Sequence, residues 1–384
     1  MTTVPLGELI EPAALKRAGT GEYTLLSMTM HDGLVEQAAR FAKRIAGRDL
    51  TQYKVVERGQ LVVSFPIDEG VLDFLSTNES GIVSPAYRVW DLSGEDSVHR
   101  PYLKRYLRSP RALNYYRIKM RGSTARRRSM PVDDFLAMPI PLPSVDEQRR
   151  IAAILDQADA IRTKRRQVIA HLDSLTQSIF HEMFDSYEAT STVSEVAIRM
   201  RTGPFGSQLL HDEFVDEGIA VLGLDNVVAN HFKWVGRRFI TEQKYEKLQR
   251  YTVSPGDVLI SIMGTTGRCV VVPNDIPTAI NTKHICAVTV DRENVDPEFL
   301  RGVFLWHPAS RAHLRRQTKG SIMAGLNMGI IKAMPIPVPP IRLQKAFTRR
   351  VDEVHAALAL ATKACDSADA LFNSLQSRAF KGEP

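Results

Sequence analysis

The sequence predicts an α+β protein in which two similar globular domains are separated by two long α-helices packed as an antiparallel coiled coil. A proline-rich run, MPIPLPSVDEQRRI, begins at Met138, and a similar run, MPIPVPPIRLQKAF, begins at Met334, 196 residues later. A long apolar pattern with heptad spacing follows each run, as is typical of coiled coils. The segments before the runs mix short strand-like stretches with turns and a few helices, which indicates α+β rather than doubly wound α/β.

Three further pairs of segments echo one another in the same order at spacings of 196 to 198 residues. They are VERGQLVVS with VSPGDVLIS (from Val56 and Val253), VHRPYL with VDPEFL (from Val98 and Val295), and MRGST with TKGSI (from Met120 and Thr318). This period is far too long for a solenoid repeat, so we interpret the chain as a duplicated domain.

A chain of 384 residues has room for two to three domains. We expect a first globular domain at 1–137, a proline turn and central long helix at 138–188, a second domain at 189–333, and a proline turn and C-terminal long helix at 334–384. The polar stretch DSYEATSTVS, from Asp185, is expected to link the first helix to the second domain.

Strands are expected in QLVVSF, GIVSPAYRVW, DVLISI, RCVVVP and HICAVTV, and helices in LVEQAARFAKRIAG (from Leu34) and DPEFLRGVFLW (from Asp296). The proline runs cannot be helical, because proline lacks the amide donor and pushes the preceding residue toward extended geometry. Ser144 and Glu147 read as a capping box at the start of the central helix. In the second copy Pro340 replaces the serine, and proline is well tolerated in a first helical turn.

The two heptad seams are expected to bury against each other. The first consists of Ile151, Ile154, Ala158, Ile161, Arg165, Val168, Leu172, Leu175 and Ile179, and the second of Val351, Val354, Leu358, Ala361, Cys365, Ala368, Phe372, Leu375 and Ala379. Only Arg165 interrupts this apolar pattern. We expect antiparallel packing, which would set the two domains at opposite ends of a rod.

Composition favours a soluble, cytoplasmic protein. Hydrophobic residues make up 44% and charged residues 24% of the chain, which is ordinary for a globular protein. We find neither a signal peptide nor an apolar run long enough to span a membrane. Cys269, Cys286 and Cys365 are scattered, so we expect no disulfide and no zinc site.

Positive charge is concentrated beside the two proline runs. The net charge is +7. Eleven Lys and Arg residues and no acidic residue lie from Arg100 to Arg128, and ten and none lie from Phe299 to Val351. One such run can be a solvated face, but two at matching positions of a repeat favour a surface for a polyanion.

No catalytic motif is evident. The stretch GTTGRC at Gly264 lacks the lysine and the spacing of a phosphate loop, and no GxSxG, HExxH or GxGxxG motif occurs. Because these motifs are missing, we expect no catalytic residue. The histidines show no metal-ligand spacing, so we also expect no metal. Asp156 and Asp159 are expected to lie on solvated helix faces.

Polar and basic residues in loops are the candidates for DNA contact, since Arg can read guanine, Asn and Gln can read adenine, and Lys mainly meets phosphate. The alternative for the RTGPFGSQL loop is a plain turn. The candidates are Arg121, Arg126, Arg127, Arg128, Arg201, Ser207, Gln208, Arg268, Asn281, Lys283, Arg315, Arg316 and Lys319.

Two domains, each followed by a proline run and a long heptad helix, resemble the specificity subunit of type I restriction–modification systems over essentially the whole chain. The sharpest element is PIPLPSVDEQRRIAAILDQADAI, and GPFGSQL and PGDVLIS are also similar to the family. The second run departs from the pattern at Arg342-Leu343-Gln344, where the glutamate is lost, and the short first domain lacks a GPFGS counterpart.

The resemblance implies two target recognition domains that each bind one half of a split double-stranded DNA site, with the paired helices as a spacer. It also implies that two DNA adenine methyltransferase subunits dock on the helices, and that a restriction or translocase subunit can join them. S-adenosylmethionine would be held by the methyltransferase subunits and no cofactor by this chain, which would position DNA without catalysis. The alternatives are a free-standing DNA-binding regulatory protein that dimerises through its helices, and an enzyme with an unrecognised site.

Overall fold

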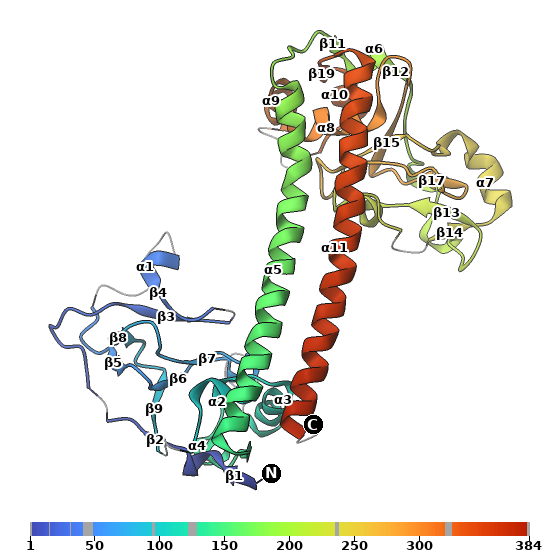
Figure 1. Cartoon of the computed structure of the whole chain (residues 1–384). Helices are drawn as coiled ribbons and strands as arrows, with labels where there is room; N and C mark the ends of the chain where they lie inside the picture. The colour runs from blue at the N-terminus through green and yellow to red at the C-terminus, as the bar shows by residue number, and fades with distance from the viewer. Residues whose placement is uncertain are drawn as a thin grey trace. The chain divides into compact units, whose positions relative to one another are not determined.

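The computed structural model describes residues 2–14, 16–30, 32–40, 49–93, 97–121, 129–234, 238–318 and 325–381. The chain forms two compact units (Figure 1): unit 1 is Met1–Arg166 with Lys363–Pro384, and unit 2 is Gln167–Thr362. The boundary between them therefore falls within both long helices, α5 (Val145–Phe184) and α11 (Ile341–Lys381).

Unit 1 is built on an antiparallel four-stranded sheet of order β2-β9-β6-β7. Its strands are β2 (Ile10–Pro12), β9 (Arg88–Leu92), β6 (Leu61–Val63) and β7 (Leu72–Phe74). Two further pairs of strands form separate two-stranded antiparallel sheets. β3 (Leu26–Thr29) pairs with β4 (Gly33–Glu36), and β5 (Lys54–Glu57) pairs with β8 (Ser80–Val83). The helices are α1 (Gln37–Arg40), α2 (Arg100–Leu107), α3 (Pro110–Lys119) and α4 (Val132–Leu136), with 3-10 turns η1 (Leu6–Glu8) and η2 (Ile67–Glu69).

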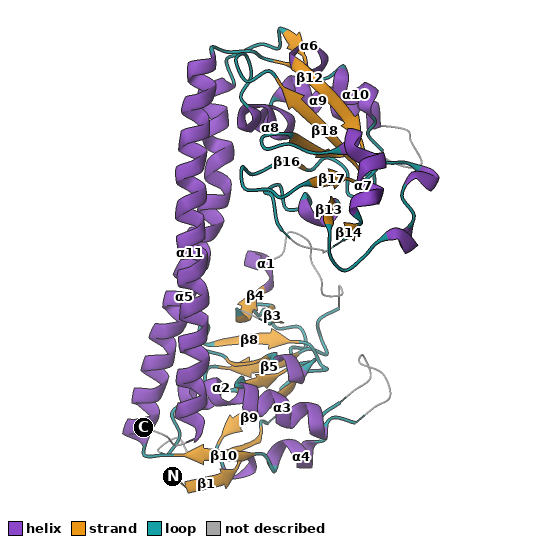
Figure 2. Ribbon diagram, turned by 90° about the vertical axis from the view of Figure 1, so that its right-hand side faces the viewer, coloured by secondary structure: helices purple, strands orange, loops and turns teal. Residues whose placement is uncertain are grey.

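Unit 2 repeats this arrangement with an antiparallel sheet of order β12-β18-β15-β16. Its strands are β12 (Ala197–Thr202), β18 (Ile285–Val290), β15 (Val258–Ser261) and β16 (Cys269–Val271), drawn as orange arrows in Figure 2. A second sheet has the order β14-β13-β17, from β14 (Phe239–Ile240), β13 (Ile219–Leu222) and β17 (Ala279–Asn281). The helices are α6 (Val193–Val196), α7 (Glu242–Leu248), α8 (Pro297–Trp306), α9 (Pro308–Thr318) and α10 (Met328–Lys332), with 3-10 turns η4 (Gly206–Gln208), η5 (His211–Glu213), η6 (Leu224–Asn226) and η7 (Gln249–Tyr251).

The duplication predicted from the sequence is present in the strand topology. Besides the identical order of the main sheets, Leu25 bridges Ile82 in parallel in unit 1, and Val221 pairs with Ile280 in parallel in unit 2. These partners are 196 and 198 residues apart, as the sequence echoes require. All five stretches expected as strands contain one, and α8 is the helix expected after Asp296.

One element differs from its expectation. The stretch from Leu34 was expected to be helical throughout, but Gly33–Glu36 is the strand β4, because its backbone pairs with β3. Within the described part of that stretch Gln37–Arg40 is helical, and residues 41–48 lie outside the described residues.

Each proline run is a short strand that pairs with the start of its own repeat. In unit 1, β10 (Pro139–Leu142) pairs antiparallel with β1 (Thr2–Pro5), and in unit 2, β19 (Pro335–Ile336) pairs with β11 (Ser191–Thr192). Two-stranded pairing leaves one edge free, so the missing proline amides break no second ladder. Ile140 and Ile336 are fully buried and anchor the strands in their cores.

A fully buried glutamine follows each proline run and joins it to the domain. In unit 1, Gln148 accepts from the amide of His99 at 2.8 Å and donates to the carbonyls of Ser97 and Pro143, both at 2.9 Å. The amide of His99 lies immediately before α2. The side chain thus satisfies three backbone groups where the long helix begins.

Gln344 makes the same contacts in unit 2. It accepts from the amide of Asp296 at 2.9 Å, and donates to the carbonyls of Asn294 at 3.1 Å and Pro339 at 2.7 Å. These partners sit 196 or 197 residues after those of Gln148. This repeated contact explains why glutamine recurs at the same place in both runs, even though the neighbouring glutamate does not.

At the start of α5 the serine of the expected capping box caps the helix, but the glutamate pairs elsewhere. Ser144 Oγ accepts from the amide of Glu147 at 3.4 Å, as a capping serine should. The Glu147 carboxylate, however, pairs with Arg150 at 3.3 Å, one turn further along the helix. In the second copy α11 begins directly after Pro340, as predicted.

Within unit 1, the start of α5 packs with the end of α11. Arg162 of α5 donates to Asp369 at 2.5 Å and lies 4.1 Å from the ring centre of Phe372. The hydrogen bond from Arg162 is the main reason that the pKa of Asp369 is lowered. At the end of α11, Phe380 lies edge-on to Tyr106 at 5.1 Å, inside the main core of the unit.

Within unit 2, the end of α5 packs with the start of α11. Phe180 and Phe184 meet Phe347 with ring centres 5.7 and 5.6 Å apart, and Phe184 meets Phe299 of α8 at 4.8 Å. Each unit therefore shows the two helices antiparallel, with a globular core that covers their ends. The predicted antiparallel coiled coil is confirmed.

The predicted buried seam is confirmed for α11, whereas about half of the positions predicted for α5 are exposed. All nine seam positions of α11 are buried or half-buried. In α5 the predicted Ile154, Ile161, Val168 and Leu175 are between 41% and 49% exposed, and Arg165 also faces solvent. The neighbouring Leu155, Arg162, Ile169 and Thr176 are buried or half-buried instead. A seven-residue period is satisfied equally by steps of three then four or of four then three, and α5 uses the second.

The acidic residues Asp156 and Asp159 are not merely solvated. Arg105 of α2 reaches Asp156 at 2.7 Å and Asp159 at 2.9 Å, so both carboxylates tie α2 to α5 within unit 1.

We predict that Gln344→Leu destabilises the protein, because it leaves a buried amide and two carbonyls without partners, at about 1–3 kcal/mol for each group. Chemical denaturation followed by circular dichroism would measure the loss. The exposed Gln157→Leu on α5 is the matched control and should leave the unfolding midpoint nearly unchanged. Equal midpoints for the two variants would contradict a structural role for Gln344.

Candidate nucleic-acid interface

Arg201 does not lie where a DNA contact was expected. The side chain is buried, and its guanidinium forms an ion pair with Asp257, which is itself fully buried. Arg201 also donates to Thr289 at 3.1 Å, and Thr289 donates to Asp257 at 2.5 Å. This network holds β12, β15 and β18 together. Because its guanidinium is committed to that network, Arg201 is not available for a DNA contact.

Asn281 is also buried, at the end of β17. Its amide donates to the carbonyl of Ile285 at 2.8 Å. The backbone at Gly203 passes so close that an added Cβ would lie 2.0 Å from the Asn281 carbonyl oxygen. This contact covers the end of β17, so the Asn281 side chain faces inward and stabilises the adjoining loop. Like Arg201, it is not available for a DNA contact.

Ser207 and Gln208 are exposed, in the turn η4. Gly206 has a φ of 57°, which favours glycine at the start of this turn. The hydroxyl of Tyr251 donates to Gln208 Oε1 at 2.7 Å and holds the side chain at the surface. The turn therefore presents polar side chains on a defined backbone.

Lys283 is exposed immediately after β17. Beside it, the pKa of His284 is lowered, first by burial and then by the positive charges of Lys283 and Arg238. Because Gly203 packs against Asn281 and Thr282, the loop before η4 and the segment after β17 lie side by side.

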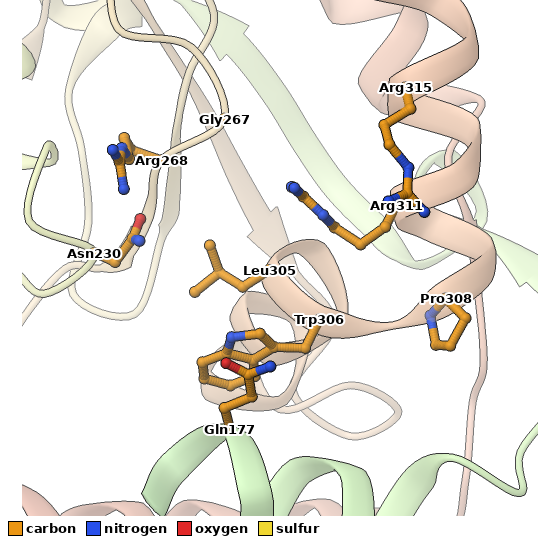
Figure 3. Close-up of a pocket in the computed structure, with 9 residues that line it drawn as sticks. All are labelled: Gln177, Asn230, Gly267, Arg268, Leu305, Trp306, Pro308, Arg311 and Arg315. Carbon is orange, nitrogen blue, oxygen red and sulfur yellow. The ribbon is translucent and has the colours of Figure 1, made fainter. Parts of the chain in front are cut away.

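Arg268 and Arg315 line a pocket of about 570 Å³ in unit 2, shown in Figure 3. Arg268 ends the turn between β15 and β16, and Arg315 lies on α9. Ile262, at the start of that turn, donates its amide to the carbonyl of His284 at 2.8 Å, so the turn adjoins the Lys283 segment. Arg316 is exposed on α9.

Among the pocket residues that sequence reasoning missed are Arg311, Trp306 and Gln177. Arg311 and Arg315 are one helical turn apart on α9, and this i, i+4 spacing was the available signal. Nothing in the sequence indicated that Gln177 of α5 would face the same pocket.

In unit 1, Arg121 is exposed and pairs with Asp134 at 3.2 Å. Its backbone forms an antiparallel bridge with Ser129. The candidates Arg126, Arg127, Arg128 and Lys319 lie outside the described residues.

In the part of the chain that the structure describes, no group of three or more His, Cys, Asp or Glu side chains is arranged to hold a metal ion. None of the helices in the described ranges combines the length and apolar character needed to cross a membrane.

Comparison with known proteins identifies the class of the second repeat. Residues 219–364 match the family model of the type I restriction modification DNA specificity domain. The chain is 23% identical over 281 residues to the specificity subunit of the type I restriction enzyme EcoBI from Escherichia coli, a match that covers 64% of this chain and 58% of that protein. It is 22% identical over 238 residues to the MjaVIII specificity subunit from Methanocaldococcus jannaschii, covering 56% and 55%. The matches thus span just over half the length of these relatives.

Two solved structures share the fold over nearly the whole chain. A chain from a study of complex assembly and conformational transition of a type I R-M system has a TM-score of 0.62 and 16% identity, covering 100% of this chain and 98% of that chain. The S subunit of the type I restriction-modification system from M. genitalium has a TM-score of 0.58 and 15% identity, covering 99% and 96%. The resemblance to type I specificity subunits is thereby confirmed.

We predict that Arg201→Met destabilises unit 2 by about 3–5 kcal/mol, because Asp257 would keep a buried charge without its partner. Lys283→Met removes the same charge from an exposed position and should change stability by less than about 0.5 kcal/mol. Urea denaturation of the two variants compares them. A fully stable Arg201→Met protein would show that the buried pair does not support the sheet.

Proposed function

We propose that the chain is the DNA sequence-recognition subunit of a type I restriction–modification complex, and that it recognises a bipartite DNA target without catalysis of its own. One observation carries the proposal. Two domains of the same strand order are each joined through a buried glutamine to a long helix, and the specificity-domain match covers the second domain from residue 219 onward. One domain would read each half of the target.

The proposed DNA contacts are the exposed or half-exposed candidates that remain. They are Arg121 in unit 1 and Ser207, Gln208, Arg268, Lys283, Arg315 and Arg316 in unit 2. Arginine and lysine there would neutralise backbone phosphates, and Gln208, with arginine, offers the hydrogen bonds that read base edges. Arg126, Arg127, Arg128 and Lys319 extend the same basic segments in sequence.

We further propose that α5 and α11 dock two DNA adenine methyltransferase subunits, which hold S-adenosylmethionine, in a cytoplasmic complex that a restriction subunit can join. Exposed apolar side chains on α5 support this docking: Ile154 and Ile161 in unit 1, and Val168 and Leu175 in unit 2. They recur every seven residues on one face of the helix, beside the seam that α11 covers.

The alternative, a free-standing regulator that dimerises through its helices, is less favoured. In both units the seam of α11 is already packed against α5 of the same chain. Co-purification of a methyltransferase would separate these hypotheses. Incubation of the isolated chain with DNA, Mg²⁺ and S-adenosylmethionine tests the third, since methylation or cleavage would reveal an enzyme.

We predict that Arg315→Ala combined with Arg316→Ala weakens DNA binding on all sequences and lowers its salt dependence by about one unit of slope for each phosphate that the variant no longer neutralises. Affinity for DNA measured at several salt concentrations between about 50 and about 200 mM, a roughly fourfold range, would show this change of slope. Arg165→Ala on α5, also exposed and outside both basic runs, serves as the charge control. An unchanged slope in the double variant would remove α9 from the interface.

If the long helices set the gap between half-sites, adding one helical turn to both should widen the preferred gap by about one to two base pairs, from about 5.4 Å per turn and about 3.4 Å per base pair. Methylome sequencing of cells that carry the lengthened protein would report the gap. Methylation at the original spacing would contradict the spacer role.

A further inference from the structure

The pocket that Arg268 and Arg315 line is strongly basic. Its wall is formed by Arg268 and Gly267 from the turn between β15 and β16, by Arg311 and Arg315 from α9, and by Leu305 and Trp306 from the end of α8. Among the residues that the structure describes, no acidic side chain lines it. A second cavity of about 370 Å³ adjoins it and shares Arg268, Arg311 and Arg315. We call the two together the arginine pocket.

Two arginines of the arginine pocket have no acidic partner among the described residues: neither Arg268 nor Arg311 forms an ion pair there, whereas Arg301 on the preceding helix is paired with Glu298. Figure 3 shows the Arg311 side chain extending from α9 toward the side of the pocket where Arg268 and Asn230 lie. Arg268 and Arg311 are half-buried, so an anion between them would be partly shielded from water.

The equivalent place in unit 1 is closed. There the turn between β6 and β7 forms η2, and its Ile67 is buried in the core. At the end of that turn, a Cβ on Gly70 would lie 3.5 Å from a methyl carbon of Leu113 on α3. Arg117 of α3 donates to the carbonyl of Asp68 in the same turn at 3.5 Å.

Two local changes open the pocket in unit 2. In the turn between β15 and β16, Gly264 stands 197 residues after Ile67, so no apolar side chain takes the place that Ile67 fills in unit 1. The helices α3 and α9 start at prolines 198 residues apart, and at this spacing Leu113 corresponds to Arg311 and Arg117 to Arg315. Because turn and helix both differ between two copies of one fold, the pocket is a feature of unit 2 and not a by-product of the fold.

We propose that the arginine pocket binds a phosphate group. Guanidinium groups suit this ligand because each can donate two parallel hydrogen bonds to phosphate oxygens. The amides of Asn230 and Gln177 can complete the contacts, and Leu305 and Trp306 form an apolar floor for an attached sugar or base. The phosphate comes from the DNA backbone or from a free nucleotide, and the first source rests on the proposed function.

The test compares the full-length chain with Arg311→Leu, which restores the residue of the first repeat and so suits the fold. Arg268→Met is the second variant, and Arg165→Leu, exposed on α5 and outside both basic runs, is the charge-matched control. Binding of ATP and of a 20-base-pair duplex without a target site is measured by calorimetry at several salt concentrations. Circular dichroism confirms that each variant is folded.

If DNA supplies the phosphate, each pocket variant should weaken duplex binding by about tenfold and reduce the salt slope by about one unit, while Arg165→Leu does neither. If a free nucleotide supplies it, ATP affinity should fall about tenfold in the pocket variants and duplex binding should stay the same. Unchanged affinity for both probes in both pocket variants would overturn the inference. These probes carry no target sequence, so the result is independent of whether the chain reads a bipartite site.

Discussion

The buried glutamine at the start of each long helix is the contact on which the architecture depends. A proline run offers carbonyl acceptors but few amide donors, so its free carbonyls need a donor from elsewhere. Gln148 and Gln344 supply that donor. At the same time each accepts from the backbone amide directly before a helix of its own domain, α2 in unit 1 and α8 in unit 2. One side chain thus couples strand, domain and long helix, and being fully buried it tolerates little movement.

The coiled coil is asymmetric in its chemistry. α11 contributes an apolar seam, whereas α5 contributes Arg162, whose guanidinium lies over Phe372 and pairs with Asp369. A charged side chain can occupy a seam in this way because its stem packs against apolar surface while its head is paired. The apolar residues that α5 does not bury recur on an adjacent face, where a partner can cover them.

The two repeats keep a common frame and differ in their loops. Strand order, proline strand and glutamine contact are shared, whereas the turn between the third and fourth strands of the sheet closes against α3 in unit 1 and leaves a basic pocket beside α9 in unit 2. Loops can diverge because few core contacts depend on them, and for that reason recognition is commonly placed there. The recognition of two different half-sites that we propose needs this combination.

Much of this protein is determined by its sequence alone. Duplication, proline strands, two long helices and basic loops all follow from local patterns, because proline chemistry and heptad spacing act over a few residues. The tertiary structure decided the rest. Arg201 looked like a surface cation until Asp257, 56 positions away, was placed beside it, and Ile154 looked like a seam residue although Leu155 takes that position. Burial depends on partners distant in the chain, and no local pattern contains them.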